Sequence, residues 1–284
     1  MSATVRASRP DQAAGRAAGR MPGTGLLDAL HAEWTKLRTI SGPGWLLLGV
    51  VALTIGLSVA AVAATHCPAG APCAVDPTKL SLTGIQFGQA VVAILAVLTI
   101  CNEYSTGLIR VTFTAMPRRE LVYAAKAIVV TGLVLVAGVL AAGGSVLAGH
   151  LILPGHGFTA ARGFHVVSLS YGPTLRAAAG SVLYLGLIAL LSLGIAAMIR
   201  DSAVSIGAAL AVLYLFPVVL VFVTSTTWQQ RLERWTPTVA GLNIQATTGL
   251  HSLPISPWGG LGVLAIWAGA ALLAGGSVLR FRDA

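Results

Sequence analysis

The sequence predicts an all-α, polytopic membrane protein. Apolar residues make up 56% of the 284 positions and charged residues only 10%, whereas soluble domains carry about 25% charged residues. The apolar residues gather in six blocks that contain no Asp, Glu, Lys, Arg or His. Each block has roughly the 20 residues that a helix needs to cross a bilayer, and none shows the alternation of a barrel strand. Six transmembrane helices therefore account for most of the chain.

The region before the first block has two parts. Residues 1–24 are rich in Ala, Gly, Arg and Pro, which predicts a disordered cytoplasmic tail. Residues 25–40 place Leu26, Leu30, Trp34 and Leu37 on one helical stripe, while Asp28, Glu33, Lys36 and Arg38 face elsewhere. This pattern is typical of an amphipathic elbow helix that lies in the membrane interface and bends at Ser41-Gly42-Pro43-Gly44 into the first span. A short soluble helix is the alternative interpretation.

The six spans follow in order, at about 45–64, 82–100, 121–149, 177–199, 202–227 and 258–279. An even number of spans puts both termini on one side of the membrane. Cytoplasmic termini leave only five of the 18 basic residues outside, namely Lys79, Arg162, Arg176, Arg231 and Arg234. Because Lys and Arg are enriched in cytoplasmic loops, we expect a multi-pass protein of the cell (plasma) membrane with both termini in the cytoplasm. This orientation also explains the net charge of +9 without a nucleic-acid partner.

The loops on the outer side hold the cysteines and histidines that invite a chemical interpretation. Cys67 and Cys73 share the first outer loop, in the run C-P-A-G-A-P-C, so a local disulfide is plausible, with two free thiols as the alternative. The three histidines between the third and fourth spans, His150, His156 and His165, have no helical ligand spacing and no acidic residue in their loop. We therefore expect no metal site.

The chain shows no catalytic motif and no nucleotide-binding motif. H-E-x-x-H, G-x-S-x-G and the Walker A loop are all absent from the sequence. The charge-free blocks also place no ionisable residue deep in a span, which argues against ion-coupled transport and against a membrane enzyme. If this protein moves a substrate, an external ATPase must act on one of its cytoplasmic surfaces. The loop between the second and third spans is the only inner loop of sufficient size.

That loop carries a resemblance to a known family. The run E-Y-S-T-G-L-I-R-V-T-F-T-A-M-P-R-R-E-L-V-Y-A-A-K-A, together with E-W-T-K-L-R in the elbow helix, resembles the permease subunits of ABC-2-type ABC transporters of high-GC Gram-positive bacteria. The likeness covers residues 25–284, and the run W-T-P-T-V-A-G-L-N, within residues 231–243, loosely resembles the outer re-entrant segment of that family. The resemblance implies the ABC-2 (type V exporter-like) architecture.

The resemblance also implies a role for the inner loop. In the family this loop forms a coupling helix that docks in a cleft of a separate ABC ATPase subunit. The matching positions are Glu103, Tyr104, Ser105, Thr106, Gly107, Arg110, Arg118 and Arg119. The implied partners are that ATPase, which would bind ATP and magnesium, and a second permease copy in a homodimer or a related heterodimer. The alternative interpretation makes the arginines topology anchors and Glu103 a helix-packing residue.

The substrate pathway is marked only weakly. Gln86 and Gln89, three residues apart in the second span, could line it, although amides in membrane helices more often bond a neighbouring helix. The function expected from the sequence is a permease subunit, without its own ATPase motif, that exports a substrate. A non-transporting scaffold, sensor or assembly protein is the alternative, and an integral membrane enzyme ranks third.

Overall fold

The computed structural model describes residues 25–39, 41–67, 75–105 and 119–282, and the regular structure of these residues is all helical, with no strand. The first half comprises α1 (Leu26–Thr39), α2 (Ser41–Ala64), α3 (Pro77–Ser81), α4 (Ile85–Ser105), α6 (Arg119–Ile152) and the 3-10 turns η1 (Leu153–His156) and η2 (Ala160–Arg162). The second half comprises α7 (Gly172–Ile199), α8 (Ser202–Leu210), the π-helical turn η3 (Ala211–Leu215), α9 (Phe216–Val221), α10 (Thr226–Trp235), α11 (Pro237–Leu242), η4 (Asn243–Gln245), η5 (Leu250–Ser252) and α12 (Pro257–Arg282).

Six of the described helices are long and apolar enough to cross a membrane. They cover Gly42–Ala64, Ile85–Ser105, Glu120–His156, Gly172–Ile199, Ser202–Leu220 and Pro257–Phe281. Each of the six predicted spans overlaps one of these helices, although the ends differ. The chain is therefore an all-helical, multi-pass transmembrane protein by the length and composition of its helices.

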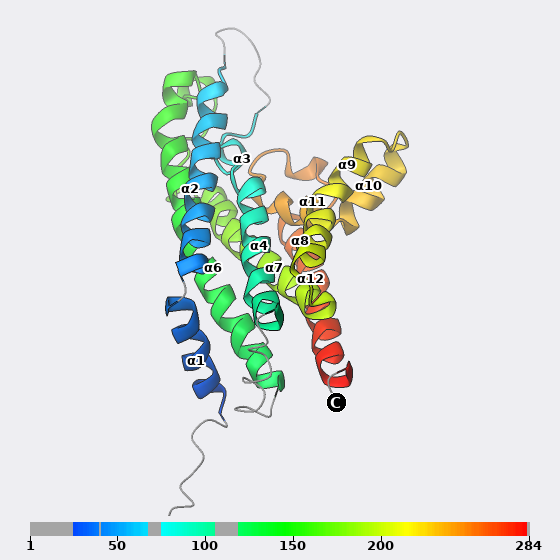
Figure 1. The fold of residues 1–284 in the computed structure, drawn as a ribbon. Coiled ribbons are helices and arrows are strands. Elements are labelled where there is room, and N and C mark those ends of the chain that lie inside the picture. The colour runs from blue at the N-terminus through cyan, green and yellow to red at the C-terminus, as the bar shows by residue number, and fades with distance from the viewer. Residues whose placement is uncertain (1–24, 40, 68–74, 106–118, 283–284) are drawn as a thin grey trace, which may run out of the picture.

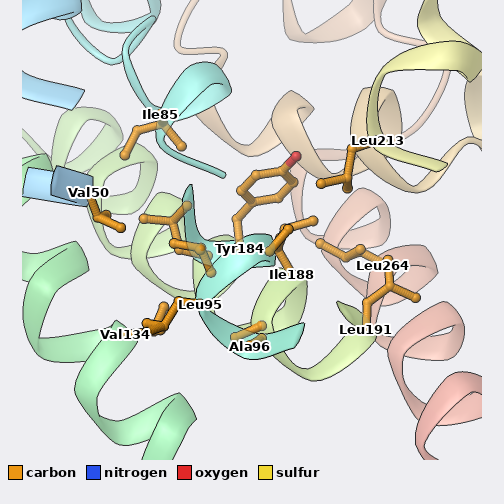
Figure 2. Packing of buried hydrophobic residues seen from close by; sticks show 14 of the residues in the cluster. Val50, Ile85, Leu95, Ala96, Val134, Tyr184, Ile188, Leu191, Leu213 and Leu264 are labelled. Carbon is orange, nitrogen blue, oxygen red and sulfur yellow. The ribbon is translucent and has the colours of Figure 1, made fainter. Parts of the chain in front are cut away.

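The helices form one bundle around α7. In Figure 1, α2 and α6 lie on one side and α8, α9 and α12 on the other, with α4 and α7 between them. About 67% of the apolar window of α7 is buried, against 22% for α2 and for the fifth span. Tyr184 of α7 lies at the centre of the core, between Ile85 and Leu95 of α4 and Leu213 and Leu264 of the other side (Figure 2). The core thus joins both halves of the chain.

Glycines permit the closest helix crossings. A Cβ on Gly84, in the turn directly before α4, would lie 1.9 Å from the backbone oxygen of Thr54, so this turn and α2 touch through their backbones. A Cβ on Gly194 would lie 2.5 Å from the backbone carbon of Ala271, which gives α7 and α12 the same kind of contact. Small residues at membrane helix interfaces allow such approach, because lipid supplies no hydrophobic force to press helices together.

The fifth span is shorter than the sequence predicts. It ends at Leu220, whereas the apolar run extends to Thr227. Pro217 has no N–H and its ring conflicts with the preceding turn of an α-helix, and the π-helical turn η3 lies directly before it. After α9 the chain turns, and α10 begins at Thr226. The apolar run therefore includes a turn as well as a helix.

The segment between the fifth and sixth spans packs into the bundle. A Cβ on Gly241 of α11 would lie 2.7 Å from the ring of Tyr184, and one on Gly180 of α7 would lie 2.0 Å from Ile244 of η4. Tyr184 lies 12 residues beyond the start of α7 at Gly172, about 18 Å along the helix axis. The α11–η4 segment thus enters the bundle from the end opposite α1.

Asp76 fastens that segment at the same end. Its carboxylate caps α3 by accepting bonds from the N–H groups of Thr78 and Lys79, at 3.0 and 3.2 Å. It also accepts bonds from the Thr247 hydroxyl at 2.7 Å, the Thr248 N–H at 3.0 Å and the Thr247 N–H. One side chain therefore joins α3, which precedes the second span, to the loop that precedes the sixth.

Candidate functional site

Four charged side chains from three elements meet at the α1 end of the bundle. Glu33 and Lys36 belong to α1, Glu103 to the last turn of α4, and Lys126 to the second turn of α6. We refer to these four residues as the charged quartet. Glu33, Glu103 and Lys126 are buried, at 3%, 8% and 6% exposure, and Lys36 is half-buried.

Four ion pairs connect the residues of the quartet. The Lys126 ammonium group lies 2.6 Å from Glu33 Oε2 and 2.9 Å from Glu103 Oε1. The Lys36 ammonium group lies 3.0 Å from Glu33 Oε1 and 3.0 Å from Glu103 Oε1. Each lysine thus bridges both glutamates, and the set has no net charge. Buried ions need such pairing, because an unpaired charge in a low dielectric is strongly unfavourable.

The pKa values of the two α1 residues shift in the direction that keeps them charged. Burial alone would raise the pKa of Glu33, but the ammonium groups of Lys126 and Lys36 together lower it below its usual value. Burial alone would lower the pKa of Lys36, but Glu33 and Glu103 together raise it. Opposite charges within hydrogen-bond distance favour the ionised forms. The ion pairs therefore favour the charged forms of Glu33 and Lys36.

The helix α1 is built to present Glu33 to the bundle. Asp28 lies in its first turn and Lys36 and Arg38 in its last, which complements the helix dipole. Its buried residues are Ala29 and Glu33, and α1 lies beside the first turns of α6 (Figure 1). The predicted assignment of Glu33 to a face turned away from the apolar contacts is wrong, since this residue faces α6.

The predicted apolar stripe of α1 divides between two environments. Trp34 is 48% exposed and Leu26 38%, while Leu30 is half-buried and Leu37 packs partly against the core. The helical character of residues 26–39 is confirmed. Placement of α1 in the membrane interface, as an elbow, stays a prediction.

The expectation that no span holds a buried ionisable residue is also wrong. Helix α4 continues past the apolar block to Ser105, and α6 begins at Arg119, so Glu103 and Lys126 lie within candidate spans. The paired charges make this extension possible, because each ion finds its partner inside the protein. Glu33 binds one ammonium group through each of its carboxylate oxygens, whereas Glu103 binds both ammonium groups through Oε1.

The predicted coupling residues lie partly within the described structure. Tyr104 packs against the core, with the Arg200 guanidinium carbon 5.2 Å from its ring centroid, and the exposed Ser105 bonds the backbone oxygen of Asn102. Arg119 begins α6. The other predicted positions lie outside the described residues, namely Thr106, Gly107, Arg110 and Arg118. Only Glu103, among the predicted set, belongs to the quartet.

The two glutamines of α4 have different environments. Gln89 is fully buried and its Oε1 accepts a bond from the Tyr184 hydroxyl, as expected for an amide that joins two membrane helices. Gln86 is exposed, and its backbone oxygen accepts a bond at 2.7 Å from the Tyr214 hydroxyl. They do not share a surface within one copy, and a role for either in a pathway stays a prediction.

The two described cysteines differ in their bonding. Cys67 is buried and disulfide-bonded, while its predicted partner Cys73 lies outside the described residues. Cys101 is buried and free, and its thiol lies 3.8 Å from the Ser205 hydroxyl. Among the described residues no three His, Cys, Asp or Glu side chains gather as metal ligands would.

Sequence reasoning missed three members of the quartet as site residues: Glu33, Lys36 and Lys126. Lys126 offered a usable signal, since it lies inside the predicted third span and a lysine at such a position needs a buried partner. The partner itself lies 93 positions away, at Glu33, and no periodicity links them.

No protein-family model matches this chain, and no curated protein is similar to it.

Proposed function

We propose that the chain is the membrane-spanning permease subunit of an ATP-driven ABC transporter of the ABC-2 type, which exports a substrate. A separate ABC ATPase subunit would bind ATP and magnesium, and a second permease copy would complete the transporter. The resemblance of residues 103–127 to that family supports the assignment. The six candidate spans are consistent with it, since they are the number expected for half of such a transporter.

The observation that carries the proposal is the position of the quartet. Glu103 lies two residues before the end of α4, and Lys126 lies in the second turn of α6. These two helices are the stems of the loop at residues 106–118, on which the ATPase would act. The quartet joins both stems to each other and to α1 through ion pairs of 2.6 to 3.0 Å.

This arrangement suits the transmission of force. A push on the loop would reach α4 and α6 together and would carry α1 with them, since the three elements share buried ion pairs. Packed helices move as rigid bodies, because a packed interface does not deform continuously. In the proposed cycle, ATP binding closes the ATPase subunits and moves the bases of the two permease copies as units, which opens the spans on the opposite side.

Identification of co-purifying proteins tests the proposal. The protein would be crosslinked lightly in its own membranes, purified and analysed by mass spectrometry. We expect a stoichiometric partner that carries a Walker A loop, and we expect its loss when Arg118 and Arg119 are both replaced by Glu. Arg38→Glu, which changes an exposed arginine of α1, serves as the control and should retain the partner. Assembly without any ATPase would contradict the proposal and favour a scaffold, sensor or assembly protein.

A further inference from the structure

An apolar groove lies between the first turns of α6 and the last turns of α12. Its volume is about 1090 Å³, slightly above the roughly 300–1,000 Å³ typical of ligand sites. Leu121, Ala124 and Ile128 line one wall, and Leu273, Gly276 and Phe281 line the other. Leu273 and Phe281 are 77% and 78% exposed, so the groove opens to the surroundings of the bundle.

Small residues keep the groove open. A Cβ on Gly276 would meet only the ring of Tyr123, at an ordinary 3.8 Å, and would otherwise point into the groove. The neighbouring Gly275 is different, because its Cβ would lie 2.8 Å from the backbone oxygen of Gly194 in α7. Gly275 therefore serves the contact between α12 and α7, whereas Gly276 leaves space for a ligand.

An exposed ion pair lies at the charged end of the groove. Arg280 Nη1 lies 3.6 Å from Glu120 Oε1, both residues line the groove, and both side chains are more than 70% exposed. The groove thus offers long apolar walls that end in one cation and one anion. Both charges lie close to the ends of candidate spans, where lipid headgroups are found.

Apolar walls that end in one cation and one anion match one class of lipid. We propose that the groove binds a phosphatidylethanolamine, with an acyl chain along the apolar walls and the headgroup at the ion pair. The Arg280 guanidinium can donate two bonds to the phosphate, and the Glu120 carboxylate can accept bonds from the primary ammonium. A phosphatidylglycerol would place its phosphate near Glu120 with no ammonium to offset that charge, and the quaternary ammonium of a phosphatidylcholine donates no hydrogen bond.

The headgroup must supply the selectivity. Bilayer chains are as apolar as the groove walls, so an acyl chain gains little by entering the groove. Exposed ion pairs contribute modestly, and we expect a preference for phosphatidylethanolamine over phosphatidylglycerol of about fivefold. This inference rests on the membrane-spanning helices and not on the proposed transport function.

Photolabelling of the reconstituted full-length chain tests the inference. Vesicles of phosphatidylcholine would hold the protein and a trace of phosphatidylethanolamine with a diazirine in one acyl chain. After irradiation, mass spectrometry should find label in residues 120–128 and 272–281. Gly276→Leu should reduce that label at least fivefold, because it fills the groove. Gly269→Leu, on the same helix where nothing lies within 4 Å of a Cβ, should leave it unchanged.

Competition addresses the headgroup. Unlabelled phosphatidylethanolamine should displace the label about five times better than phosphatidylglycerol does, and this preference should vanish when Glu120→Gln and Arg280→Gln are combined. Equal labelling of the Gly276→Leu and Gly269→Leu variants, or equal competition by the two lipids, would overturn the inference. So would disulfide-linked dimers of a Ser277→Cys variant in membranes, because the groove would then be an interface between two copies.

Discussion

Replacement of Lys126 by Met should release α1 from the bundle while the spans stay folded. The ammonium group of Lys126 lies 2.6 Å from Glu33 Oε2 and 2.9 Å from Glu103 Oε1, and its side chain is 7% exposed. Met has nearly the length of Lys, so the change removes the charge and leaves most of the packing. It also leaves two buried carboxylates with one lysine.

The burial of the ion pairs sets the free energy that Lys126→Met should remove from the docking of α1. Removal of one partner from a buried ion pair destabilises by about 3–5 kcal/mol. Lys36 still lies 3.0 Å from each carboxylate, so we expect the lower end, about 3 kcal/mol. Since each 1.4 kcal/mol is a factor of about ten, docked α1 should become roughly 100-fold less favoured.

Hydrogen exchange of the protein in lipid nanodiscs measures this change directly. The amides of residues 26–39 should exchange about 100-fold faster in Lys126→Met, while those of α7 should be unaffected. Arg38→Met removes the same charge from an exposed position of α1 and should change exchange by less than about threefold.

A second variant separates charge from packing. Glu33→Gln added to Lys126→Met restores a neutral set, with Lys36 and Glu103 still paired at 3.0 Å, and should recover at least half of the lost protection on a logarithmic scale. The reasoning is refuted if Lys126→Met leaves α1 as protected as the wild type, or if Arg38→Met exposes it equally.

Three further predictions concern pH and packing. Because the pKa of Glu33 is lowered, the stability that this carboxylate contributes is present above its unfolded pKa of about 4.3 and is lost as the pH falls through the folded value. The protection factors of the α1 amides, which correct for the pH dependence of intrinsic exchange, should therefore be constant from about pH 5 to 8 and should fall below about pH 4; a transition near neutral pH would contradict this. Gly260→Ala would place a Cβ 1.9 Å from a backbone oxygen of α11 and should lower the free energy of unfolding by about 1–3 kcal/mol. Gly262→Ala, whose Cβ would have nothing within 4 Å, should not lower it. Equal melting temperatures of the two variants would show that the α11–α12 contact is misplaced. Tyr184→Phe removes the donor to buried Gln89 Oε1 and should cost about 1–3 kcal/mol in thermal unfolding, and an unchanged melting temperature would exclude the bond.

The sequence predicts the spans well because the signal for a transmembrane helix is one-dimensional. A run of about 20 apolar residues must be a helix if it crosses lipid, whatever its neighbours are. The ends of these helices are less predictable. Helix α4 continues to Ser105 because its buried Glu103 is paired, and the fifth span stops at Leu220 although the apolar run continues.

The quartet could not be derived from local patterns. Helical spacing places Glu33 beside Leu30 and Leu37, on the apolar stripe of α1 and not away from it. Whether Glu33 faces water or Lys126 depends on the way α1 packs on α6, which is a tertiary contact between residues 93 positions apart. Glu103 was recognisable as a site residue only through the resemblance of its surrounding run, which contains no information about its partners.

The relative motion of two copies during an ATP cycle tests the account most directly. His31 is exposed on α1, so a spin label on His31→Cys would report the distance between the α1 helices of paired copies in native membranes. We expect a defined inter-copy distance that shifts when a non-hydrolysable ATP analogue is added, and that stays fixed when the Walker A lysine of the co-purifying ATPase is replaced. No inter-copy signal, or a distance that ATP never changes, would contradict the proposal that this chain is an ATP-driven permease subunit.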